Sequence, residues 1–145
     1  MMDKKILLTG DAGGLGQEIS RQLAKQGAQL ILLDRNEAQL NKMCEEINQV
    51  GGWAVSVVND FSGANAAESI IQECKQKAGD IDILINSAGV LDFTYFVKQN
   101  PARISQTMYV NTIVPMLLTR AVLPSMVTRN AGQIVNIGSI FGSIG

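Results

Sequence analysis

The sequence predicts an α/β protein in which helices cover both faces of a doubly wound parallel sheet. Short apolar runs alternate with longer segments of helical periodicity along the whole chain. The runs are apolar at consecutive positions, as parallel strands buried on both faces are. Hydrophobic residues make up 46% and charged residues 17% of the 145 residues, which is enough apolar surface for one core. We therefore expect a single domain over residues 1–145.

Five apolar runs are predicted to be strands. They are residues 5–10, 30–34, 53–58, 81–86 and 133–138. Right-handed crossovers, with a reversal of strand order after the third strand, predict the order 3-2-1-4-5. The first two helices then lie on one face of the sheet and the later helices on the other.

The three helices between the first four strands are each predicted from one apolar stripe. The stripe residues are Leu15, Ile19 and Leu23, then Leu40, Met43, Cys44 and Ile47, then Ile70, Ile71, Cys74 and Ala78. Ser62 is expected to cap the third helix. Cys44 and Cys74 should lie on opposite faces of the sheet, so we expect no disulfide between them.

The longest predicted helix, residues 104–129, is apolar nearly all round. Such a helix is buried on both sides or partly covered by another subunit. Pro115 lies four residues after Asn111 and has no backbone N–H, so the carbonyl of Asn111 loses its usual helical donor. The sequence therefore predicts a kink and a free acceptor at this point.

Composition excludes several classes of function. The formal net charge is −1, with interspersed acidic and basic residues, which indicates no surface for nucleic acid or anionic lipid. The chain has no histidine, and its two cysteines are thirty residues apart, so we expect no metal site and no redox pair. No run reaches the roughly 18 apolar residues of a membrane span. We expect a cytoplasmic protein with reduced thiols.

A glycine-rich turn, TGDAGGLG at residues 9–16, joins the first strand to the first helix. Glycines there permit positive φ and let a pyrophosphate approach the N–H groups of the helix N-terminus. Asp34, at the end of the second strand, is placed to accept a hydrogen bond from a ribose hydroxyl. The residues of the turn expected to bind cofactor are Gly10, Asp11, Gly14, Leu15 and Gly16. A purely structural turn and a solvated strand end remain the alternatives.

Four motifs together resemble the short-chain dehydrogenase/reductase family, whose fold is of the Rossmann type. TGDAGGLG is similar to the family's TGxxxGxG loop, and NSAG at residues 86–89 is similar to its NNAG motif. VNTIVP around Asn111 resembles its helix asparagine, and IVNIGSIFG at residues 134–142 resembles the strand that carries its catalytic serine. The resemblance covers the whole chain.

This resemblance implies further contacts to a dinucleotide. Asp60 and Phe61 would flank the adenine ring, with the Asp60 carboxylate accepting from its amino group. Asn86, Ala88 and Gly89 would run beside the ribose and stabilise the central sheet. Asp60 could instead be a helix-entry acid, and Asn86 a turn former.

The charges near the end of the second predicted strand bear on the choice between NAD and NADP. Asp34 would repel the 2′-phosphate of NADP, whereas the adjacent Arg35 could attract it. Gly13, where many NADP-using relatives have a basic residue, adds no positive charge. We therefore favour NAD over NADP.

The resemblance also implies two catalytic residues. Ser139 would hydrogen-bond the substrate oxygen, and the carbonyl of Asn111 would hold a water in a proton relay, although a solvent-filled kink is the alternative for Asn111. The family's tyrosine and lysine would follow beyond Gly145. Neither Tyr95 nor Tyr109 has a lysine four residues on, so both are interpreted as packing residues.

The implied activity is that of an NAD(P)-dependent oxidoreductase that transfers a hydride between nicotinamide and a small alcohol or ketone. Its longer parent protein is expected to be a homo-oligomer. Because the chain lacks the Tyr-x-x-x-Lys pattern, we expect it to bind cofactor and catalyse little by itself. The alternative is a non-catalytic dinucleotide-binding or sensor module.

Overall fold

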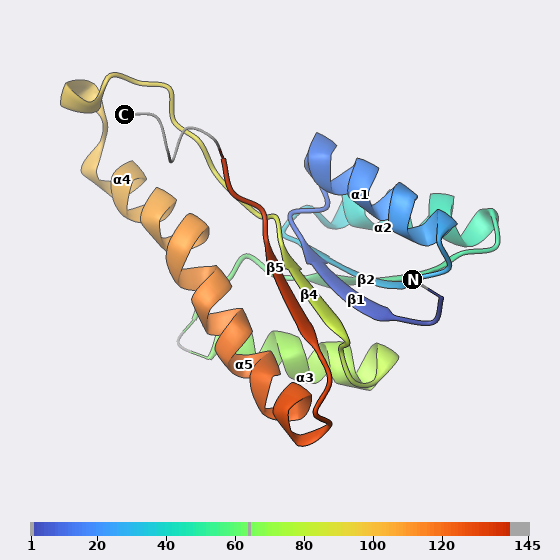
Figure 1. Ribbon diagram of the computed structural model, residues 1–145. Coiled ribbons are helices and arrows are strands. Elements are labelled where there is room, and N and C mark those ends of the chain that lie inside the picture. Colours follow the sequence, from blue (N-terminus) through green and yellow to red (C-terminus); the bar gives the residue numbers. More distant parts are fainter. Residues whose placement is uncertain (1, 64, 140–145) are drawn as a thin grey trace.

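A five-stranded parallel sheet forms the centre of the protein, with strand order β3-β2-β1-β4-β5 (Figure 1). The computed structural model describes residues 2–63 and 65–139. The strands are β1 Lys5–Thr9, β2 Gln29–Asp34, β3 Trp53–Val58, β4 Ile83–Asn86 and β5 Gln133–Asn136. The predicted fold class and strand order are confirmed. β4 and β5 are each two residues shorter than expected, although Asp82 and Ile137 still donate backbone hydrogen bonds to the neighbouring strands.

Helices cover both faces of the sheet, as the crossover rule requires. α1 Gly14–Lys25 and α2 Glu37–Gln49 lie on one face, and α3 Ala66–Ala78 and α5 Val114–Thr128 lie on the other (Figure 1). Each face has its own apolar core, and Leu7 and Leu8, adjacent on β1, belong to different cores. This alternation explains why β1 is apolar at consecutive positions.

The two cysteines lie on opposite faces, as expected. Cys44 of α2 packs in one core and Cys74 of α3 in the other, and both thiols are free. Burial raises the pKa of Cys44 to about 11 and that of Cys74 to about 12. Both side chains are therefore protonated at neutral pH and act as small apolar groups.

The predicted cap of α3 is wrong. Asn65, not Ser62, occupies the N-cap position, and its side chain makes no capping hydrogen bond. Ser62 instead donates its backbone N–H to Oδ1 of Asp60 at 2.9 Å. Gly63 follows with a φ of +98°, so the chain completes a turn before the helix begins.

The long helix is continuous over Pro101–Thr128 but changes its winding in the middle. α4 Pro101–Met108 leads into a π-helical turn, η2 Tyr109–Ile113, and then into α5. In η2 the N–H of Val114 donates to the carbonyl of Tyr109, five residues earlier. Pro115 supplies no N–H to Asn111, so a wider turn accommodates the missing hydrogen bond without ending the helix. The prediction placed the start of this helix three residues late.

Only one side of this helix is covered within the described residues. Val114, Leu118, Val122 and Met126 are buried against the sheet, whereas Met116 is 64% exposed and Val127 72% exposed. The helix is also long and apolar enough to cross a membrane, with a mean hydropathy of 1.4 over its most apolar window. This apolar character is not visible as one long apolar run in the sequence, because polar residues interrupt every run. One such helix is weak evidence for a membrane span, since core helices of soluble proteins share these properties.

Candidate nucleotide-binding site

The glycine turn connects β1 to α1 at the carboxyl ends of the strands and packs against the segment that follows β4. Gly10 has a φ of +78°, and a Cβ at this position would lie 2.6 Å from the Cα of Ala88. At Gly16 a Cβ would lie 2.3 Å from the carbonyl oxygen of Gly10. Both positions exclude any side chain, because the backbone packs against backbone there. By contrast, a Cβ at Gly14 would have no atom within 4 Å.

The N-terminus of α1 has hydrogen-bond donors that no side chain caps. Gly13 occupies the N-cap position without a side-chain hydrogen bond, and the first turn contains no acidic residue. The first-turn N–H groups of a helix have no partner within the helix, and the helix dipole adds partial positive charge there. The open space at Gly14 therefore adjoins a site suited to an anion such as a pyrophosphate.

Asp34 holds the turn from the end of β2. Its Oδ2 accepts a hydrogen bond from the N–H of Ala12 at 3.2 Å, and its Oδ1 accepts from the N–H of Asn36 at 3.1 Å. Arg35 is exposed beside it, and its positive charge contributes to lowering the pKa of Asp60. Opposite charges thus lie next to each other at the end of β2.

The segment after β3 forms the next part of the site. Oδ1 of Asn59 accepts from the N–H of Phe61 at 2.7 Å, which supports the positive φ of 61° at Phe61. Hydrogen bonds from Ser62 lower the pKa of the exposed Asp60 carboxyl. The Tyr109 hydroxyl donates to the carbonyl of Phe61 at 3.0 Å, so η2 anchors this segment.

Thr9 fixes the segment that follows β4. Its hydroxyl oxygen accepts hydrogen bonds from the N–H groups of Ser87 at 3.1 Å and Ala88 at 3.0 Å. Thr9 is only 1% exposed, so water does not replace these bonds. The hydroxyl thereby connects the glycine turn directly to NSAG.

Asn111 holds the same segment from the helix side. Its Oδ1 accepts from the N–H of Val90 at 2.8 Å, and its Nδ2 donates to the carbonyl of Val90 at 2.9 Å. The side-chain amide thus pairs with both backbone groups of one residue, as a residue on a neighbouring antiparallel strand would. The Oδ1 and Nδ2 atoms of Asn111 are therefore both used in hydrogen bonds to Val90. The role that the resemblance implies for Asn111, holding a water, concerns its backbone carbonyl instead.

These segments enclose a cavity of about 450 Å³ at the carboxyl ends of the strands. That volume is in the range typical of small-molecule sites. Ten predicted cofactor residues line it: Gly10, Gly14, Leu15, Gly16, Asp34, Arg35, Asp60, Phe61, Ala88 and Gly89. Asp11 and Asn86 are predicted cofactor residues outside this lining, because both side chains are buried. Asn86 donates from Nδ2 to Oδ1 of Asn136 at 2.8 Å and so connects β4 to β5.

Ser139 lies just beyond β5 and is exposed. The hydrogen bond from Ile137 N–H to the carbonyl of Asn86, at 2.9 Å, continues the β4–β5 pairing toward it. The last part of its motif, residues 140–142, lies outside the described residues. Tyr95 is 81% exposed, so its interpretation as a packing residue is wrong, whereas Tyr109 is held through its hydroxyl.

Nearly the whole chain matches one protein-family model. The family model described as short chain dehydrogenase matches residues 4–145. The chain belongs to the short-chain dehydrogenase/reductase family. The match includes the glycine turn, NSAG, the segment around Asn111 and residues 134–142.

Relatives and solved structures of short-chain dehydrogenases/reductases extend well beyond this chain. It is 36% identical to the ketoacyl reductase HetN of a Nostoc species over 98% of its own length and 50% of the relative's. It is 34% identical to the oxidoreductase UcpA of Escherichia coli over 97% and 53%, respectively. The chain therefore spans about half the length of these curated relatives.

Two solved structures share the fold of this short-chain dehydrogenase/reductase. A gluconate 5-dehydrogenase from Burkholderia cenocepacia, in complex with NADP and tartrate, superimposes with a TM-score of 0.91 at 28% identity, over 100% of this chain and 57% of that one. A metagenomic short-chain oxidoreductase in complex with NADP gives a TM-score of 0.89 at 31% identity, over 96% and 63%, respectively.

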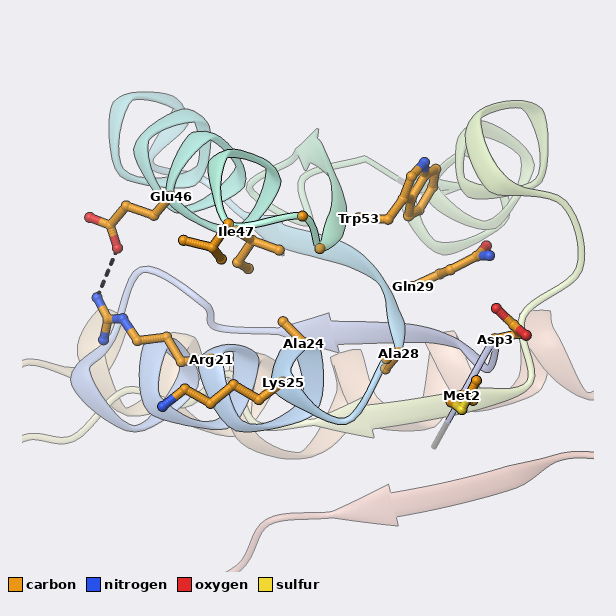
Figure 2. A pocket seen from close by; sticks show the side chains of 14 residues that line it. Met2, Asp3, Arg21, Ala24, Lys25, Ala28, Gln29, Glu46, Ile47 and Trp53 are labelled. Atoms are coloured by element: carbon orange, nitrogen blue, oxygen red, sulfur yellow. Dashed lines mark hydrogen bonds and ion pairs between the residues drawn. The ribbon is translucent and has the colours of Figure 1, made fainter.

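A larger cavity, of about 850 Å³, opens at the opposite end of the sheet (Figure 2). It lies between α1 and α2 beside the first residues of β2 and β3, with the 3.2 Å ion pair of Arg21 and Glu46 at one end. No residue of the glycine turn lines it. Ligands of doubly wound sheets bind at the carboxyl ends of the strands. The smaller cavity at that end is therefore the candidate nucleotide site of this short-chain dehydrogenase/reductase, although the cavity at the other end has the larger volume.

Sequence reasoning missed two residues that shape the site. Thr9 belongs to the glycine motif, but the motif by itself predicts no role for its hydroxyl. Asn59 precedes two predicted adenine contacts, and an asparagine at the end of a strand is a known signal for a side-chain-stabilised turn. That signal could have identified Asn59, whereas the partners of Thr9 lie 78 and 79 residues further along the chain.

Proposed function

We propose that this chain forms the cofactor-binding part of an NAD(P)-dependent oxidoreductase that transfers a hydride between nicotinamide and an alcohol or ketone. The observation that carries the proposal is the open space at Gly14, which adjoins the uncapped N-terminus of α1 inside a cavity lined by the predicted cofactor residues. These features fit a dinucleotide, because its pyrophosphate needs both donors and close backbone approach.

Each part of the cavity offers contacts to a different part of the cofactor. The turn around Gly14 would hold the pyrophosphate through backbone N–H groups. The Asp34 carboxylate would accept from the adenosine ribose, since each oxygen uses only one of its acceptor positions on the protein backbone. Asp60 and Phe61 would bind the adenine, and Ala88 and Gly89 would lie along the second ribose.

The catalytic proposal concerns Ser139 and Asn111. When bound, the nicotinamide supplies or accepts the hydride. Ser139 would donate a hydrogen bond to the substrate oxygen and so stabilise the negative charge that develops there. The carbonyl of Asn111 would hold a water that relays a proton, because Pro115 withholds the usual helical donor. A Tyr-x-x-x-Lys element, absent from these 145 residues, would supply the acid.

We propose a small alcohol or ketone as substrate, and a homo-oligomer for the whole protein. The exposed apolar side chains of α5, including Met116 and Val127, support an assembly in which this face is covered.

Binding and turnover test the proposed function separately. We expect the purified chain to bind NAD⁺ in isothermal titration calorimetry, and to show almost no oxidation of NADH with a panel of ketones. An absence of binding would contradict the proposal. Steady turnover would show that the chain does not need the Tyr-x-x-x-Lys element. Binding without turnover, even when that element is supplied, would favour the non-catalytic module.

We also propose NAD as the preferred cofactor, and Asp34→Asn tests this preference. Asparagine keeps one oxygen acceptor for the turn but removes the charge that would repel a 2′-phosphate. We expect the ratio of NADP⁺ to NAD⁺ affinity to rise by a factor of about 10, equivalent to about 1.4 kcal/mol. Arg35→Gln is the matched control and should move the ratio in the opposite direction. A wild-type chain that binds NADP⁺ more tightly than NAD⁺ would contradict the preference.

A further inference from the structure

Asp11 is the second residue of the glycine turn that follows β1, yet its side chain is buried. The residue is 0% exposed, and its Oδ1 accepts a hydrogen bond from the hydroxyl of Ser20 on α1. Its other oxygen, Oδ2, is buried and has no hydrogen-bond partner among residues 2–63 and 65–139. A buried carboxyl group with one unsatisfied oxygen is costly when ionised. Asp11 does not line the cavity, so direct contact with a cofactor does not explain this carboxyl group.

We propose that Asp11 is a positioning residue that couples dinucleotide binding to its own protonation. The neutral acid holds the glycine turn against α1 in the form that binds pyrophosphate, and the ionised acid weakens that binding. This inference rests on the proposed function, because it concerns the same cavity.

The geometry connects the Asp11 carboxyl to the anion site through the backbone. A Cβ at Gly16 would lie 2.8 Å from the Cα of Asp11, so the first turn of α1 packs directly on this residue. The next residue, Ala12, donates its N–H to Asp34. The Asp11 carboxyl is also joined to Ser20 of α1, so a rearrangement of this side chain would shift the turn that lines the cavity relative to α1.

The surroundings of Asp11 disfavour its charge. Burial raises its pKa, the hydrogen bond from Ser20 opposes this, the negative charge of Asp34 raises the pKa further, and Arg21 lowers it. Cys44 of α2 also faces Asp11, and its own pKa is raised to about 11, first by burial and then by the Asp11 charge, so it stays neutral. An ionised Asp11 would thus add a second negative charge, beside Asp34, to a site for a diphosphate.

The sign of the pH dependence follows from linkage. Because the folded pKa of Asp11 lies above the ordinary value of 3.8, the folded state binds more protons than the unfolded state between these two values. This residue's contribution to the free energy of unfolding therefore falls as pH rises through that window. Dinucleotide affinity should fall as pH rises through the folded pKa, and binding within that range should take up protons.

The test is calorimetric titration of the purified chain with NAD⁺, which has no 2′-phosphate to titrate, from about pH 4.5 to about pH 8.5. Buffers of different ionisation enthalpy report proton uptake. Asp11→Asn keeps an acceptor for Ser20 and cannot ionise. Glu18→Gln is the matched control, because it removes a carboxylate from the exposed side of the same helix.

We expect the dissociation constant of the wild type and of Glu18→Gln to rise about fivefold across the transition. Asp11→Asn should show a flat profile without proton uptake. The same pH dependence in Asp11→Asn as in the wild type would overturn the inference. Failure of all three proteins to bind NAD⁺ at any pH would instead contradict the proposed function.

Ser20→Ala keeps the inference testable if Asp11→Asn does not fold. The Ser20 hydrogen bond lowers the pKa of Asp11, so its removal should shift the transition in affinity to higher pH. An unchanged transition in a folded Ser20→Ala protein, as judged by circular dichroism, would overturn the inference.

Discussion

Gly16→Ala is expected to lower the free energy of unfolding by about 3 kcal/mol, whereas Gly14→Ala should leave it unchanged or raise it by about 0.5 kcal/mol. The two glycines are two residues apart in one turn, but their surroundings differ. A Cβ at Gly16 would lie 2.3 Å from the carbonyl oxygen of Gly10. That oxygen is a backbone atom of the tightly packed turn, so it cannot rotate away as a flexible side chain could. A Cβ at Gly14 meets no atom within 4 Å.

Nucleotide binding should respond differently from stability. Both substitutions are expected to weaken NAD⁺ binding by a factor of about 10 or more, the first by distorting the turn and the second by filling space that the pyrophosphate needs. Thermal unfolding and calorimetric titration measure the two effects. A Gly14→Ala protein that is stable and binds NAD⁺ like the wild type would place the pyrophosphate elsewhere.

Thr9→Val is expected to lower the free energy of unfolding by about 2–4 kcal/mol. Valine has nearly the same shape as threonine, but it leaves the N–H groups of Ser87 and Ala88 without the oxygen that accepts from both. An unsatisfied donor costs about 1–3 kcal/mol when fully buried, and these two hydrogen bonds are partly buried, so we expect about 1–2 kcal/mol for each. NAD⁺ affinity should also fall, because the segment after β4 lines the cavity.

Thr9→Ser is the matched control for this prediction. It keeps the hydroxyl and removes one methyl group, so we expect a loss of about 1 kcal/mol. Denaturant unfolding of both proteins at one temperature separates the hydrogen bonds from the packing. Equal losses in the two variants would show that packing, and not the paired hydrogen bonds, explains the role of Thr9.

The fold was predictable because its signals are local. The apolar runs of β1 and β2 and the stripe of Leu40 and Ile47 are set by periods of a few residues. The contrast between the two faces of the sheet then follows from the alternation along each strand. The errors occurred where nearby polar residues compete, as at Ser62, whose backbone joins the turn at Asp60 instead of capping α3.

Much of the candidate site was predictable for the same reason. Gly10 and Gly14 lie in one short motif, and Asp34 ends the next strand, so strand direction alone brings them to one edge of the sheet. Asp11 was grouped with them by position in the motif. Its side chain points to Ser20, nine residues away, and this contact depends on how α1 packs over the turn.

The sequence by itself determined the parallel sheet, its strand order, the family and ten of the residues that line the cavity. Only the tertiary structure decided which polar groups hold that cavity together. The Thr9 hydroxyl meets Ser87 because β1 pairs with β4, and Asn86 meets Asn136 because β4 pairs with β5 in a definite register. Register is set by packing between segments far apart in the chain, so no local pattern contains it.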